Sequence, residues 1–134
     1  MSHPNDQEGI RHAIEASKHA YAPYSKHAVG AWLVAEDGTG YSGCNVENAA
    51  FPAGVCAERG ALAHAVSKGA RRFKAVYIAT PKGGSPCGVC RQMLYEFSPT
   101  MRVVCVDFDG NVHIDTTLEA LLPFGFGGAQ LPDV

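Results

Sequence analysis

The sequence lacks the features that mark several specialised classes of protein. No apolar run is long enough to span a membrane, and the polar start MSHPNDQEGI has no apolar core like that of a signal peptide. Lysine and arginine number 11 against 13 aspartates and glutamates, without a basic block. Because phosphate neutralisation supplies most of the affinity for nucleic acids, we do not expect the chain to bind them. We expect a cytoplasmic protein without membrane attachment.

The five cysteines are an odd number, which argues against a framework of disulfides. With 46% apolar and 18% charged residues, 134 residues can build a hydrophobic core without needing a metal to hold it. No linker, internal repeat or low-complexity segment interrupts the chain. We therefore expect a single domain over residues 1–134, in which the cysteines are buried or bind a metal.

The first part of the chain has the pattern of a helix followed by a β-hairpin. Asn5 and Glu8 have the spacing of a capping box. Apolar residues at helical spacing then continue to Tyr21, and Pro23 would end the helix. Two apolar segments joined by Asp-Gly at residues 37–38 predict a pair of antiparallel strands.

The remainder alternates helical and extended segments. The patterns predict helices over residues 56–69 and 88–97, separated by an apolar strand at 74–80. A second hairpin turns at Asp-Gly, residues 109–110, and a short helix at 116–122 follows it. Strand–helix–strand alternation favours parallel strands covered by helices. The expected fold is α/β, a three-layer α/β/α sandwich with a five-stranded mixed sheet.

Three cysteines stand at the starts of two of these predicted helices. Cys56 begins one, and Cys87 and Cys90 begin the other, each after a turn that contains glycine and proline. Helices on one face of a sheet can bring such ends together, where free amides and the helix dipole favour thiolates. Three thiolates could share one zinc ion. The Cys87–Cys90 pair alone would equally fit a redox dithiol or buried thiols, and we expect Cys44 and Cys105 to be buried.

Two charged residues after Cys56 bear on whether such a zinc would be structural or catalytic. Structural zinc has four protein ligands, whereas catalytic zinc leaves one position for water. Glu58 could take a proton from that water and return it as a general acid, or could simply complement the helix dipole. Arg59 lies one turn after Cys56 and could bind a ligand sulfur; Arg91 is a second candidate for this contact.

Five ordered segments give the chain a specific resemblance: YAPYSKHAVGA, GCNVENAA, CAERGAL, SPCGVCRQMLYEF and LLPFGFG. Over nearly its whole length the chain resembles the small homotetrameric zinc-dependent cytidine deaminases. The resemblance implies hydrolytic deamination of cytidine and deoxycytidine in pyrimidine salvage. It also implies one Zn²⁺ per subunit, bound by Cys56, Cys87 and Cys90, with Glu58 moving the protons.

The resemblance further implies a set of substrate-binding residues. Asn45 and Glu47 match the pair that hydrogen-bonds the ribose, since an amide and a carboxylate together can donate to and accept from a hydroxyl. Backbone groups near three positions would read the base: Ala57, Ser85 and Cys87. Phe126 matches an aromatic residue that a neighbouring subunit lends to the pocket. Independently, the apolar segment LPFGFGGAQL should be covered either by its own domain or by another subunit.

His27 departs from the family pattern, which usually has a phenylalanine that packs against the pyrimidine. An imidazole can stack on the base but adds polarity and can titrate near neutral pH. One alternative is therefore a deaminase of a modified cytidine or a nucleoside antibiotic, with His27 altering the base pocket. A second alternative, a structural zinc or interaction domain, requires four protein ligands and loss of the fold on chelation.

Overall fold

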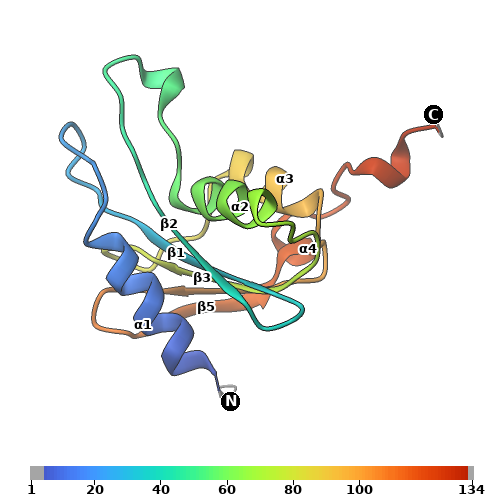
Figure 1. The fold of residues 1–134 in the computed structure, drawn as a ribbon, viewed down its shortest axis with the longest axis horizontal. Coiled ribbons are helices and arrows are strands. Elements are labelled where there is room, and N and C mark those ends of the chain that lie inside the picture. Colours follow the sequence, from blue (N-terminus) through green and yellow to red (C-terminus); the bar gives the residue numbers. More distant parts are fainter. Residues whose placement is uncertain (1–4, 133–134) are drawn as a thin grey trace.

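The computed structural model describes residues 5–132, which form a five-stranded sheet with helices on both faces (Figure 1). The helices and strands in chain order are α1 (Asp6–Ser17), β1 (Gly30–Ala35), β2 (Gly40–Cys44), α2 (Ala57–Ser67), β3 (Phe73–Ala79), α3 (Gly88–Tyr95), β4 (Arg102–Val106), β5 (Val112–Thr117) and α4 (Leu118–Leu121). Two short 3-10 turns, η1 (Phe51–Ala53) and η2 (Gly128–Gln130), lie in the loop before α2 and after α4.

The strand order is β2-β1-β3-β4-β5, with β3 and β4 parallel and every other neighbouring pair antiparallel. The predicted five-stranded mixed sheet is therefore confirmed. Because β1 is antiparallel to both β2 and β3, strands β2, β3 and β4 all run in the same direction. Their carboxyl ends meet at one edge of the sheet, where the loops leading to α2 and α3 begin.

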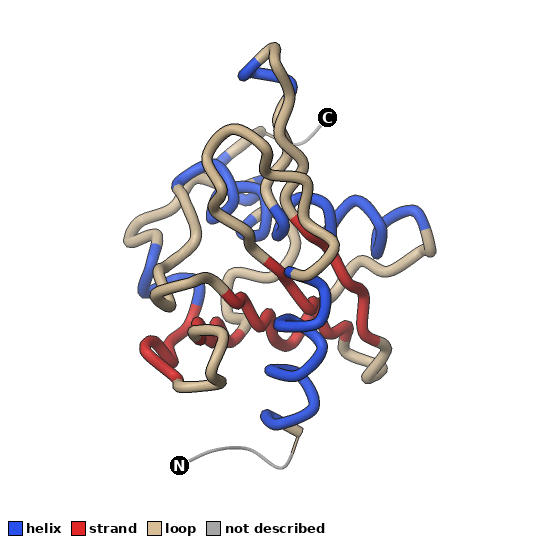
Figure 2. Tube along the Cα trace, turned by 90° about the vertical axis from the view of Figure 1, so that its left-hand side faces the viewer, coloured by secondary structure: helices blue, strands red, loops and turns tan. Residues whose placement is uncertain are grey.

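Helices cover both faces of the sheet, which confirms the three-layer arrangement. Helix α1 packs on one face, where Ala13 lies among buried residues that include Tyr77 and Val104. Helices α2 and α3 lie on the opposite face over a core that includes Leu33 and Ile78. Figure 1 shows α1 and the α2–α3 pair on opposite sides of the strands, and Figure 2 shows the same layers after a quarter turn.

A glycine in β2 determines how closely α2 approaches the sheet. A Cβ atom added at Gly43 would lie 2.3 Å from the carbonyl oxygen of Ala57 and 2.4 Å from the amide nitrogen of Ala61. Any larger residue would push the helix outward. Gly43 therefore allows the first turn of α2 to rest directly on β2, at the edge where the three strands end.

Helix α1 differs from the sequence prediction at both ends. Asn5 makes no side-chain capping bond, and its φ of −97° and ψ of 6° are not the extended conformation of a capping residue, so the predicted capping box is wrong. The helix also ends at Ser17 rather than near Tyr21. The backbone of Tyr21 instead bonds to Asn45 and Glu47 in the loop after β2, and this distant pairing replaces the last helical turn.

The remaining boundaries follow the sequence closely, with one exception. Both predicted hairpin turns form, with Gly38 at φ 92° and Gly110 at φ 88°. The predicted helix over 116–122 is shorter, because Thr116 and Thr117 pair with β4 and extend β5. Of the helices in residues 5–132, none combines the length and apolar character needed to cross a membrane.

Candidate active site

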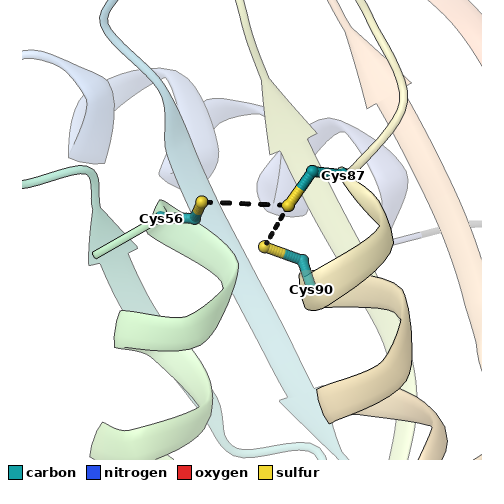
Figure 3. Close-up of side chains that lie close together, drawn as sticks. All are labelled: Cys56, Cys87 and Cys90. Carbon is teal, nitrogen blue, oxygen red and sulfur yellow. Dashed lines mark hydrogen bonds between the residues drawn. The ribbon is translucent and has the colours of Figure 1, made fainter. Parts of the chain in front are cut away.

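The starts of α2 and α3 lie side by side at the carboxyl edge of the sheet. Cys56 is the residue that caps α2, Cys87 caps α3, and Cys90 lies in the first turn of α3. Neither capping cysteine uses its sulfur to bind a helix amide. Figure 3 shows the three side chains pointing toward one another from the two helices. The sheet topology explains this meeting, because both helices follow strands that end at the same edge.

The spacing of the three sulfurs fits a shared metal ion. Sγ of Cys56 lies 4.0 Å from Sγ of Cys87, which lies 3.3 Å from Sγ of Cys90, and all three sulfurs fall within 4.8 Å of one another. Tetrahedral zinc with Zn–S bonds of about 2.3 Å separates its sulfur ligands by about 3.8 Å. Among residues 5–132, the group contains no fourth histidine, cysteine or carboxylate. These three cysteines could therefore hold a metal ion as its protein ligands.

The remaining cysteines lie outside this group. All five cysteines are unpaired in the described residues. Cys105 is fully buried in β4, as predicted. Cys44, at the end of β2, is partly exposed rather than buried.

Glu58 lies in the first turn of α2 with only 5% of its surface exposed. Burial raises the pKa of its carboxyl group, and hydrogen bonds from its own backbone amide and from Cys90 offset this only in part. A buried carboxyl group next to a metal site can accept a proton and later release it during a reaction. Its position therefore suits proton transfer better than mere complementation of the helix dipole.

Arg59 is the cation that reaches the sulfur group. Its Nη2 donates to the carbonyl oxygen of Gly54 at 2.9 Å and lies 4.0 Å from Sγ of Cys56. This contact with Cys56 raises the pKa of Arg59, so the guanidinium remains charged. Its Nε is buried and has no hydrogen-bond acceptor within residues 5–132. Arg59 therefore lies within reach of one sulfur, and its role in offsetting negative charge on the sulfurs stays a prediction.

The pKa values of Cys87 and Cys90 are shifted in opposite directions. Burial alone would raise the pKa of Cys87, but hydrogen bonds from Cys90 and Val89 in the first turn of α3 lower it. Burial and the nearby charge of Glu58 raise the pKa of Cys90. These two thiols therefore differ in how readily they ionise, and a Zn²⁺ bound by the sulfurs would favour the thiolate form of each.

Asn45 and Glu47 lie in the loop after β2 and hold the neighbouring loop of residues 21–29. The Asn45 amide donates to the carbonyl oxygen of His27 at 2.7 Å and accepts from the Val29 amide at 2.8 Å. Oε1 of Glu47 accepts from the amides of residues 24 and 25 at 3.0 and 3.1 Å. The two proposed ribose-binding residues are thus fixed side by side.

Ser25 is a residue that the sequence did not single out. Its hydroxyl donates a short hydrogen bond to Oε2 of Glu47 and accepts one from the His27 amide at 3.0 Å. The hydrogen bond from Ser25 lowers the pKa of Glu47 and keeps it ionised. Only its place within the segment PYSKHA, two residues before His27, could have drawn attention to this serine.

Arg91 does not make the predicted contact with a ligand sulfur and bonds to three oxygen atoms instead. Its Nε donates to the carbonyl oxygen of Pro86 at 2.8 Å, Nη2 to the hydroxyl of Ser85 at 2.8 Å, and Nη1 to the carbonyl oxygen of Leu121 at 2.7 Å. These acceptors are all oxygen atoms. Arg59 rather than Arg91 therefore makes the contact with a ligand sulfur.

The other predicted substrate-binding residues lie at the same end of the molecule or on its tail. Ala57 is the buried first residue of α2, and the Ser85 and His27 side chains are exposed in loops. The carbonyl oxygen of Phe126 accepts from Gln92 of α3 at 2.8 Å, while 55% of the Phe126 surface is exposed. The C-terminal segment leads away from the body of the molecule (Figure 1).

A separate cavity of about 520 Å³ lies on the opposite face of the sheet, beside α1. Its walls include Trp32, Tyr77 and Arg102, whose side chains are engaged in packing and ion pairs on that face. The convergent sulfurs and the buried carboxyl group, rather than cavity size, locate the candidate active site.

Comparisons with known proteins agree with this geometry. Residues 3–107 match the family described as the cytidine and deoxycytidylate deaminase zinc-binding region. A curated cytidine deaminase from Sporosarcina psychrophila is 46% identical over 125 residues, which cover 91% of each chain.

Solved structures extend the similarity to the fold. The crystal structure of cytidine deaminase from Burkholderia pseudomallei superimposes with a TM-score of 0.85 at 42% identity, covering 94% of this chain and all of that one. That of cytidine deaminase from Mycobacterium tuberculosis gives a TM-score of 0.78 at 34% identity, covering 90% of this chain and 96% of that one. The three convergent cysteines, the matching fold and the extent of these similarities place the chain in the zinc-dependent cytidine and deoxycytidylate deaminase family.

Proposed function

We propose that this protein hydrolyses cytidine and deoxycytidine to uridine and deoxyuridine, releasing ammonia, with one Zn²⁺ per subunit. The observation that carries the proposal is the meeting of three cysteine sulfurs beside the buried carboxyl group of Glu58. A structural zinc domain is the less suitable alternative, because the sulfur group has no fourth protein ligand within residues 5–132.

Cys56, Cys87 and Cys90 would hold the zinc ion. When bound, zinc supplies a Lewis acid that makes a water molecule nucleophilic at neutral pH. Glu58 would accept a proton from that water and deliver it to N3 of the pyrimidine, which makes C4 more electrophilic. The oxygen of that water would then bond to C4. Glu58 would take the remaining proton from this oxygen and transfer it to the amino group, so that the C4–N bond breaks, C4 becomes a carbonyl and ammonia leaves.

The substrate would be held at its sugar and at its base by different loops. Asn45 and Glu47 would bind the ribose hydroxyls, supported by their own bonds to residues 24–29. Backbone groups of Ala57, Ser85 and Cys87 would bind the edge of the pyrimidine, and the exposed ring of His27 would contact its face.

We further propose that the protein works as a homotetramer in which neighbouring subunits share each pocket. Several exposed apolar side chains support this arrangement, because leaving them in water is unfavourable. They lie near the proposed site and on the C-terminal segment: Tyr24, Phe51, Val89, Phe124 and Phe126. In the tetramer Phe126 of one subunit would reach the pocket of another.

We also propose a cellular setting for the reaction. Residues 1–134 would act as one catalytic domain in pyrimidine salvage. Five unpaired cysteines, three of which would have to remain reduced to bind zinc, fit the cytoplasm better than an oxidising compartment.

Ammonia release across a panel of substrates tests this function directly. The panel contains cytidine, deoxycytidine, cytosine, a cytidine nucleotide and a short single-stranded DNA, with zinc measured in the same preparations. We expect turnover of the two nucleosides and little of the others. Turnover of the nucleotide or the DNA alone would identify a different substrate class, and no release from any of them would refute the proposal.

A further inference from the structure

The loop that would read the base, residues 80–87, needs support from outside itself. It contains consecutive glycines, of which Gly83 adopts φ 71°, and ends at the zinc-binding position Cys87. Its first half is fixed by a hydrogen bond of 2.9 Å from the Gly84 amide to the hydroxyl of Thr80. The ring of His113 also packs directly on Gly83, where a Cβ atom would lie 2.4 Å from it.

The second half of the loop is held by one side chain from α3. Arg91 donates from Nε to the carbonyl oxygen of Pro86 and from Nη2 to the hydroxyl of Ser85, both at 2.8 Å. A hydroxyl has one hydrogen, and Ser85 uses a lone pair to accept from Arg91. The Ser85 hydrogen is therefore free to be donated toward a ligand.

The same guanidinium holds the start of the C-terminal segment. Nη1 of Arg91 donates to the carbonyl oxygen of Leu121, the last residue of α4, at 2.7 Å. The next residue on α3, Gln92, donates to the carbonyl oxygen of Phe126. The base-reading loop and the segment bearing Phe126 are thus tied to the same turn of α3.

We infer that Arg91 is a positioning residue for the pyrimidine: by binding Ser85, Pro86 and Leu121 at once, it sets the base-reading loop relative to the zinc-binding cysteines. This inference rests on the proposed function. The planar guanidinium directs its donors at three acceptors in fixed directions, which an ammonium group cannot reproduce. A lysine would keep the charge and lose the geometry.

This role predicts a defect in base binding without loss of zinc. In Arg91→Lys, the KM for cytidine and the inhibition constant of uridine should each rise by about tenfold, as expected when charge-assisted hydrogen bonds are lost. The ratio of kcat/KM for cytidine to that for deoxycytidine should stay within about twofold, since Asn45 and Glu47 bind the sugar. Zinc retention against a chelator should match the wild type.

Three further proteins make the test specific. Ser85→Ala removes one of the three bonds on an exposed residue, and should raise the KM by a smaller factor. If the two residues act together, adding Ser85→Ala to Arg91→Lys should have almost no further effect. Arg72→Lys, an exposed arginine before β3, is the matched control and should leave every parameter unchanged.

Hydrogen exchange over residues 80–87 provides a readout that requires no substrate. Exchange should be at least about tenfold faster in Arg91→Lys than in the wild type or in Arg72→Lys. An unchanged KM together with unchanged exchange would overturn the inference. So would a loss of activity proportional to lost zinc, which would assign Arg91 to the cysteines. If the wild type releases no ammonia, the proposed function fails, while hydrogen exchange still decides whether Arg91 holds the loop.

Discussion

The guanidinium of Arg102, at the start of β4, lies 2.6 Å from a carboxylate oxygen of Asp6, the first residue of α1. A second bond of 2.9 Å makes the contact bidentate, and the hydroxyl of Tyr77 donates to the same carboxylate at 2.7 Å. Only 5% of the Asp6 side chain is exposed. Three elements that are distant in sequence therefore meet at one buried carboxylate, which fixes α1 on the sheet.

Replacing this carboxylate should destabilise the fold substantially. Asp6→Ala leaves Arg102 and Tyr77 without their shared partner, and we expect a loss of about 3 kcal/mol in the free energy of unfolding. Urea denaturation of the purified protein measures it. The matched control is Glu15→Ala, which breaks an exposed pair with Lys18 and should cost less than about 0.5 kcal/mol. Equal losses in the free energy of unfolding for the two variants would show that the buried contact stabilises the fold no more than the exposed ion pair does.

The sequence predicted the strands, turns and metal-binding group because these are encoded by short local patterns. The Asp-Gly turns and the alternation of apolar segments each require only a few consecutive residues. The cysteines could be grouped because two helix starts that follow parallel-running strands must meet at one edge. Cys56 and Glu58 are also only two residues apart, so the sequence alone places a carboxyl group beside a cysteine that could bind the metal.

The features that were missed depend on partners far away in the chain. Nothing near Tyr21 indicates that its backbone will pair with the loop after β2, so the end of α1 was placed too late. Arg102 is 96 positions from Asp6, and no local pattern joins them. Arg91 was considered for a sulfur because of its neighbour Cys90, whereas its actual acceptors lie in a loop and at the end of α4.

Glu58→Gln should separate catalysis from metal binding. Glutamine has nearly the same shape but cannot carry the proton, so ammonia release should fall by about 10²–10⁴-fold. Because burial already disfavours the ionised carboxylate, the fold should be at least as stable as that of the wild type. Zinc content and circular dichroism provide these checks, and Glu119→Gln in α4 serves as the control. Normal turnover by Glu58→Gln would end the proposed mechanism.

Removal of zinc should abolish activity without unfolding the protein. The core between the sheet and α2 includes Leu33, Ile78 and Val103, and its packing does not require the cysteines to hold a metal. A chelator should therefore eliminate ammonia release while the far-ultraviolet circular dichroism stays native, and added Zn²⁺ should restore activity. Cooperative unfolding on chelation would instead indicate a structural zinc.

Asp107 should make the stability depend on pH in acid. Its carboxylate lies 2.8 Å from Nε2 of His113 and also accepts from the amides of Asp109 and Asn111. The hydrogen bond with His113 is the main cause that lowers the pKa of Asp107 to about 2. The unfolded value is about 3.9, so the stabilisation is complete above about pH 4 and disappears as the pH falls through about 2.

Asp107→Asn should accordingly be less stable than the wild type at pH 6, and the difference should shrink between about pH 4 and 2. Urea midpoints measured on metal-free protein over this range test the prediction, so that loss of zinc in acid does not contribute. Asp109→Asn in the same turn is the control and should show no such pH dependence. A difference that stays constant down to pH 2 would rule out titration of Asp107 as its cause.

His27 should affect which pyrimidines are accepted more than whether cytidine is turned over. Its backbone amide donates to Ser25 and its carbonyl oxygen accepts from Asn45, while the residue is exposed. In His27→Phe the polar ring becomes apolar without losing its flat shape, so we expect cytidine turnover to persist. The KM for each ring-modified cytidine, divided by the KM for cytidine, should change by about threefold or more.

His19→Phe, at an exposed position just after α1, is the control. Identical relative KM values for several modified bases would remove His27 from the determinants of specificity.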